Sequence, residues 1–129
     1  MIILDTHAWL YWVDDNLKEF SKVALAEIKK ATTLGVSVIS CWEIAMLVVK
    51  QRLSLSMDVM DWISQALRYP GTRLLDLEPE IAVMSTRLPG KFPGDPADQI
   101  IVATCLRHGA PLVTKDGKIH SWGKIRTIW

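Results

Sequence analysis

The pattern of apolar and polar residues predicts short strands separated by helices. Residues 2–4 form an apolar run typical of a buried strand, and the β-branched run 36–39 predicts a second strand. Residues 72–77 and 111–114 predict two further strands, and residues 125–128 predict an edge strand. The chain therefore predicts a sheet of four to five strands.

Between these strands, apolar residues recur at helical spacing. The predicted helices cover residues 8–13, 21–34, 40–52, 58–69, 79–88 and 96–108. Gly35 and Gly109 are expected to end the helices that precede them. Strands that alternate with crossover helices predict a mostly parallel sheet between two helical layers. The expected fold class is α/β, with a three-layer α/β/α architecture.

Length and composition predict one domain spanning residues 1–129, with half of its residues hydrophobic and therefore not disordered. Apolar runs such as residues 44–49 are far shorter than the ~20 residues that cross a bilayer, so we expect no membrane association. No basic segment precedes Asp5, so the N-terminus does not resemble a signal peptide. Cys41 and Cys105 lack disulfide or zinc spacing, and we expect a reducing, cytoplasmic location.

Acidic residues gather at the predicted strand exits. Asp5 directly follows the first strand, Glu43 lies past the second, Asp95 and Asp98 open a helix, and Asp116 follows the fourth strand. The carboxyl ends of parallel strands share one edge of the sheet, where such folds place their sites. Clustered carboxylates repel one another unless a cation lies between them. Hard oxygen ligands suit Mg²⁺ or Mn²⁺, so this edge predicts a divalent-metal site.

Each acid except Asp5 also has a structural interpretation. Residues 40–43 match a capping box, in which Glu43 would bond back to the start of its helix. Asp95 fits an N-cap before a proline, and Asp116 fits a plain turn. Asp5 has no evident capping role. Capping does not require every acid to lie at one edge, so their joint placement favours a functional site.

Four motifs, in this order, resemble those of PIN-domain nucleases, above all the small VapC-type toxins of toxin–antitoxin pairs. The motifs are MIILDTH at the N-terminus, SxxEIA at 40–45, LPxxFPxDPADxxIVAT at 88–104 and LVTxD at 112–116. The resemblance covers nearly the whole chain. It implies a PIN-like fold and a metal-dependent endoribonuclease that hydrolyses RNA with a metal-activated water, leaving a 5′-phosphate and a 3′-hydroxyl.

The family's catalytic, metal-binding acids match four residues of this chain, Asp5, Glu43, Asp98 and Asp116. Asp95 matches a further acid of the family, and its roles as metal ligand and as N-cap both stay open. Gln99 departs from the family, in which Arg is common at this position. The resemblance also implies a homodimer and a cognate antitoxin. Trp9 and Trp12 therefore have two interpretations, as core residues or as a surface covered by a partner.

Other side chains near the acids have candidate roles. Thr6 and Thr114 could orient carboxylates from a second layer around the metal. Lys115 could contact a substrate phosphate or be solvated. His7 is expected to line the cleft rather than serve as the base, because a metal-activated water removes the need for one.

The net charge of +1 does not exclude an RNA substrate. It is the balance of 15 basic and 14 acidic residues, and setting the five clustered acids aside leaves 9 acids and a balance of +6. The bases expected to meet a phosphate backbone are Lys91, Lys115, Lys118, Lys124 and Arg126. We expect RNA binding that weakens with salt and requires the metal.

Two other function classes stay open. A phosphoacceptor signalling domain also combines clustered aspartates with Mg²⁺, but it suits Glu43 and Asp98 poorly because both lie at predicted helix starts. A catalytically silent binding module, whose acids only cap helices, predicts no binding of Mg²⁺ or Mn²⁺. Phosphodonor labelling would support the first, and calorimetry tests the second.

Overall fold

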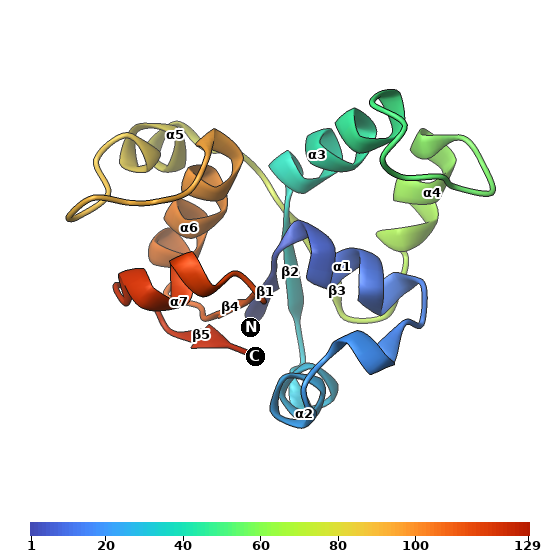
Figure 1. Ribbon diagram of the computed structural model, residues 1–129, viewed down its shortest axis with the longest axis horizontal. Helices are drawn as coiled ribbons and strands as arrows, with labels where there is room; N and C mark the ends of the chain where they lie inside the picture. Colours follow the sequence, from blue (N-terminus) through green and yellow to red (C-terminus); the bar gives the residue numbers. More distant parts are fainter.

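A computed structural model describes all residues, 1–129, and contains one five-stranded sheet (Figure 1). The strands are all parallel and lie in the order β3-β2-β1-β4-β5. Their bounds are β1 Ile2–Leu4, β2 Leu34–Ser37, β3 Thr72–Leu75, β4 Leu112–Val113 and β5 Thr127–Ile128. The predicted α/β class and parallel sheet are therefore confirmed.

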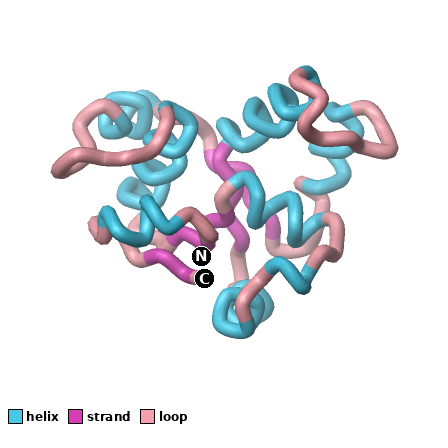
Figure 2. The backbone as a smooth tube through the Cα atoms, in the orientation of Figure 1, coloured by secondary structure: helices cyan, strands magenta, loops and turns pink.

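Seven helices surround the sheet and form the outer layers (Figure 2). Their bounds are α1 Thr6–Val13, α2 Lys22–Lys30, α3 Val38–Val49, α4 Val59–Ala66, α5 Pro79–Ser85, α6 Pro96–His108 and α7 Gly117–Trp122. A short 3₁₀ helix, η1 Leu17–Glu19, joins α1 to α2. Neither η1 nor α7 was expected from the sequence. No helix is long and apolar enough to cross a bilayer.

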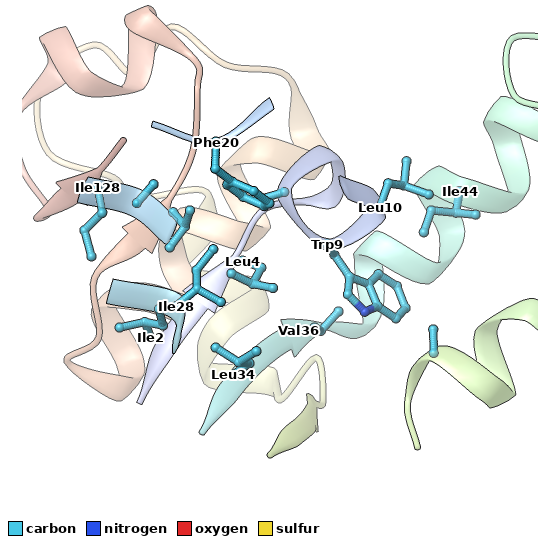
Figure 3. Close-up of a cluster of buried hydrophobic side chains, with 14 of the residues drawn as sticks. Ile2, Leu4, Trp9, Leu10, Phe20, Ile28, Leu34, Val36, Ile44 and Ile128 are labelled. Carbon is cyan, nitrogen blue, oxygen red and sulfur yellow. The ribbon is translucent and has the colours of Figure 1, made fainter. Parts of the chain in front are cut away.

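The central strand β1 supplies both hydrophobic cores, because successive side chains of a strand point to opposite faces. Ile2 and Leu4 pack into the larger cluster with residues of α1, α2, α3 and α4, drawn in Figure 3. Ile3 packs into the smaller cluster with residues of α6 and α7. Trp9 is 1% exposed in the larger cluster, so the core interpretation is correct for this residue.

The start of α3 differs from the sequence prediction. The expected strand 36–39 ends at Ser37, whose hydroxyl caps α3 by accepting from the amide of Ile39 at 3.2 Å. This cap outweighs the β-propensity of the residues that follow. Gly35 lies within β2 rather than after a helix, and a Cβ there would lie 2.8 Å from Leu75 Cδ1. Glycine thus permits close packing beside β3.

Candidate active site

A cavity of about 380 Å³ lies at the carboxyl edge of the sheet, where β1 and β4 end side by side. It brings together all five acids that the sequence placed at strand exits or helix starts, Asp5, Glu43, Asp95, Asp98 and Asp116. The strand order reverses between β1 and β4, because β2 and β3 lie on one side of β1 and β4 and β5 lie on the other. Ligands bind at such a reversal point in open parallel sheets. The predicted convergence is therefore present in the structure.

Three of the acids cap helices as well as lining the cavity. Asp5, Asp95 and Asp116 accept from the backbone amides of Ala8, Asp98 and Lys118, each at 2.8 Å. The expectation that Asp5 has no capping role was wrong, because α1 begins directly at Thr6. Asp116 likewise caps α7 instead of forming a plain turn. Each cap uses one carboxylate oxygen and holds the group in place.

Glu43 lies inside α3 and takes no part in a capping box. The helix begins at Val38, so Ser40 lies in its first turn and cannot be the N-cap. Ser40 is also fully buried. The Thr6 hydroxyl donates to Glu43 Oε1, and Thr6 Oγ1 lies 2.9 Å from Ser40 Oγ. The capping interpretation of Glu43 was therefore wrong. Thr6 orients this carboxylate across the gap between α1 and α3.

Thr114 connects the acids of the two neighbouring strands. It is fully buried directly after β4, and its Oγ1 accepts from the Asp116 amide at 3.1 Å. Burial raises the pKa of Asp5, and a hydrogen bond with the Thr114 side chain opposes part of this rise. Thr114 thus lies behind the cavity and positions both aspartates.

The negative charge of the five acids exceeds the positive charge of the side chains around them. Burial, reinforced by the nearby carboxylates of Asp95 and Glu43, raises the pKa of Asp98 to about 7. Burial also raises the pKa of Asp5 and of Glu43, against the opposing hydrogen bonds from Thr114 and Thr6. A group of part-buried carboxylates with raised pKa values is an arrangement that a bound cation would stabilise.

The donor set fits a hard divalent cation. All the acidic side chains of the cavity offer carboxylate oxygens, which are the metal ligands that Mg²⁺ and Mn²⁺ prefer. No group of three or more Asp, Glu, His and Cys side chains is arranged to hold a metal ion in this structure. The divalent-metal site therefore stays a prediction, and Mg²⁺ does not require a complete protein cage because it keeps several waters and accepts substrate phosphate.

The other lining residues include two aromatic side chains that the sequence reasoning missed. Trp129 directly follows β5 and therefore reaches the same carboxyl edge as Asp5. Tyr11 lies on α1 one turn after His7, and all three line the cavity. The strand-exit rule, applied to the last strand, could have identified Trp129. Helical spacing from His7 could have identified Tyr11.

Lys115 is the one Lys or Arg residue that lines the cavity. Its ammonium lies 3.6 Å from Glu19 Oε2 and 5.8 Å from the centre of the Trp129 ring. Lys115 is exposed, so its ammonium contacts Glu19 and Trp129 while remaining largely in solvent. His7 is exposed and lines the cavity, which matches its expected place in the cleft.

Comparisons with known proteins agree with the fold and the motifs. Residues 2–124 match the model of the PIN domain. The chain is 36% identical to Ribonuclease VapC22 of Mycobacterium tuberculosis over 130 residues, which span 99% of this chain and 98% of that protein.

Solved structures share the fold at low sequence identity. The VapBC2 complex from Rickettsia felis, bound to a promoter DNA fragment, aligns with a TM-score of 0.71 at 17% identity, covering 98% of this chain and 97% of that one. FitAcB from Neisseria gonorrhoeae aligns with a TM-score of 0.64 at 20% identity, covering 98% and 96%. The family model and the full-length relative together show that this chain belongs to the PIN-domain family.

Proposed function

We propose that this protein is a divalent-metal-dependent endoribonuclease and the toxin of a toxin–antitoxin pair, acting in the cytoplasm. The observation that carries the proposal is the cavity on which Asp5, Glu43, Asp98 and Asp116 converge. The VapC22 relative, which is named a ribonuclease, supports RNA as the substrate. The proposed ligands of Mg²⁺ or Mn²⁺ are these four acids, and Asp95 holds the start of α6 beside them.

The reaction is the addition of water across a phosphodiester bond. A water oxygen bonds to phosphorus, the bond from phosphorus to the 3′ oxygen breaks, and the 3′ oxygen takes up a proton. The products carry a 5′-phosphate and a 3′-hydroxyl. When bound, a divalent ion supplies Lewis-acid polarisation of the phosphate and lowers the pKa of water.

The chain's own residues hold the reacting groups in place. Asp5 and Asp116 are fixed by their capping bonds and by Thr114, so their orientation is set before substrate arrives. Thr6 fixes Glu43 in the same way. Because these groups are already in place, they need not reorient during the reaction. Such preorganisation is a major source of catalytic power.

The proposal is tested by cleavage of a mixed RNA pool with Mg²⁺ or Mn²⁺, with and without EDTA. EDTA should abolish cleavage, and Asp5→Asn and Asp98→Asn should each reduce it by at least ~10–100-fold. Asp76→Asn is a matched control, because Asp76 is exposed and lies outside the cavity. Undiminished cleavage in the two cavity variants would refute the assignment of these ligands.

An antitoxin and a second copy of the chain are the proposed protein partners. The toxin–antitoxin complexes with the same fold support this part of the proposal. Co-expression with the product of a short open reading frame directly upstream should restore growth that the chain alone inhibits. Sedimentation velocity tests for the dimer.

The signalling alternative is disfavoured by the strand order. Flavodoxin-like signalling domains have the order 2-1-3-4-5, whereas this sheet has the order β3-β2-β1-β4-β5. The silent binding module predicts no metal-dependent cleavage, so the RNA assay separates it from the proposed enzyme.

A further inference from the structure

A second groove opens beside the acid-lined cavity and shares His7, Glu43 and Asp95 with it. Its volume is about 290 Å³. One wall is formed by α3 and the turn after it, including Trp42, Met46, Lys50 and Arg52, and the other by the start of α6. We call it the α3 groove. It begins at the acids and extends along α3.

Trp42 presents a large apolar surface in the α3 groove. It is 56% exposed and stacks on no other aromatic ring of the protein. Met46 and Lys50 follow it at four-residue intervals, so the three residues lie on one face of α3. An exposed indole beside a catalytic cavity provides a flat platform for a planar ligand.

Two unpaired cations lie at the far end of the α3 groove. Lys50 and Arg52 are exposed, and neither takes part in the three ion pairs of the protein. Lys50 lies seven residues after Glu43 near the end of α3, which places its backbone roughly 10 Å further along the helix axis. Positive charge therefore lies at a distance from the carboxylates, where a second phosphate of a bound strand would be attracted.

We propose that the α3 groove binds the nucleotide next to the scissile phosphate, with its base stacked on Trp42 and its outer phosphate on Lys50 and Arg52. This inference rests on the proposed ribonuclease function. Stacking accepts any base but requires that the base be unpaired. The α3 groove thereby selects single-stranded segments of RNA.

An RNA strand fits this surface better than a protein segment does. The α3 groove shares three residues with the cavity in which the phosphate is cut, so a strand held in one would enter the other. Its charged end is positive, as a polyanion requires. The competing occupant is a second copy of this chain, and the experiments below distinguish the two.

Binding is measured by fluorescence anisotropy with a labelled single-stranded 2′-O-methyl RNA in Mg²⁺, whose integrity is checked on a gel. Trp42→Ala should raise the Kd about 5- to 150-fold, the usual range for loss of one stacked base. Trp42→Phe should recover most of the affinity. Met60→Ala is the matched control, because Met60 is 59% exposed on α4, outside the α3 groove, and this variant should bind like the parent.

The phosphate contacts are tested by salt dependence. Replacing Lys50 and Arg52 together by Ala should reduce the slope of log K against log salt by about 0.7 for each cation removed. Replacing Lys29 and Lys30 by Ala removes the same charge from the exposed end of α2 and should leave the slope unchanged. Equal slopes for the two double variants would overturn the phosphate assignment.

Other outcomes decide the stacking assignment. On an RNA of the same length without bases, Trp42→Ala should bind like the parent, since no base remains to stack. If Trp42→Ala binds normal RNA as Met60→Ala does while remaining folded by circular dichroism, the inference fails. If it instead changes only the sedimentation of the protein, the α3 groove is an interface between copies. Absence of metal-dependent cleavage by the parent would refute the proposed function separately, because this binding assay requires no cleavage.

Discussion

Replacement of Asp98 by Asn should stabilise the fold while inactivating the protein. Burial and the neighbouring carboxylates of Asp95 and Glu43 raise the pKa of Asp98 to about 7, from an ordinary value of 3.8. The charged form is therefore disfavoured in the folded state. Asn has nearly the same shape and can keep the hydrogen bond with the backbone of Asp95. It removes the negative charge that the neighbouring carboxylates repel.

The size of the effect follows from the two pKa values. The folded protein binds this proton more tightly than the unfolded chain, so stability falls as the pH rises from about 4 to about 7 and stays reduced above that. The difference sets a ceiling of about 4 kcal/mol. Since Asp98 is only half-buried, solvent screening lowers the expected gain for Asp98→Asn to roughly 1–2 kcal/mol at pH 8.

Thermal unfolding in EDTA, followed by circular dichroism at pH 8 and pH 4, measures the gain. Asp98→Asn should melt several degrees above the parent at pH 8, at roughly 3–5 °C per kcal/mol, and equal to it near pH 4. Asp76→Asn should match the parent at both pH values, because Asp76 is exposed. Mg²⁺ should raise the melting temperature of the parent more than that of Asp98→Asn. A variant less stable than the parent at pH 8 would show that electrostatic repulsion does not dominate at this position.

Three further results are expected. Thr6→Val removes the hydroxyl bound to Glu43, so RNA cleavage should fall ~10-fold or more while Thr6→Ser retains it; equal rates would contradict the positioning role. In Gly94→Ala, a Cβ would lie 2.7 Å from Asp98 Cβ, so cleavage and melting temperature should both fall. Gly117→Ala, with nothing within 4 Å, should change neither, and a harmless Gly94→Ala would refute the packing argument. Burial raises the pKa of both cysteine thiols, so iodoacetamide at pH 8 should label the unfolded chain much faster than the folded protein, as mass spectrometry would show.

The sequence predicted the architecture well where two independent patterns agreed. The helix at 96–108 was predicted with its observed bounds, because Asp95 and Pro96 mark its start and Gly109 marks its end. The strand 2–4 was also correct, since its apolar run stops at the charged Asp5. Local chemistry at both ends is what made these elements predictable.

Prediction failed where a local capping bond outweighed residue propensity or where the helix was short. Val38 and Ile39 favour a strand by propensity, yet they begin α3 because Ser37 caps the helix. The short helix α7 has no apolar period long enough to recognise, and it is held by the capping bond of Asp116.

The candidate site could be predicted because four of the five acids follow a strand or open a helix, Glu43 lies on the helix after β2, and parallel strands bring their carboxyl ends to one edge. Capping a helix does not keep an acid out of the cavity, since Asp5, Asp95 and Asp116 cap helices and also line it. The hydrogen bond from Thr6 to Glu43 joins two residues that are 37 positions apart in sequence and lie on different helices. No local pattern could specify its geometry.

Calorimetric titration with Mn²⁺ tests most directly whether the acids form a divalent-metal site. The parent should bind Mn²⁺, Asp76→Asn should bind it equally well, and Asp5→Asn should bind it at least ~10-fold more weakly. Absence of binding to the parent, or equal binding to the parent and Asp5→Asn, would contradict the account.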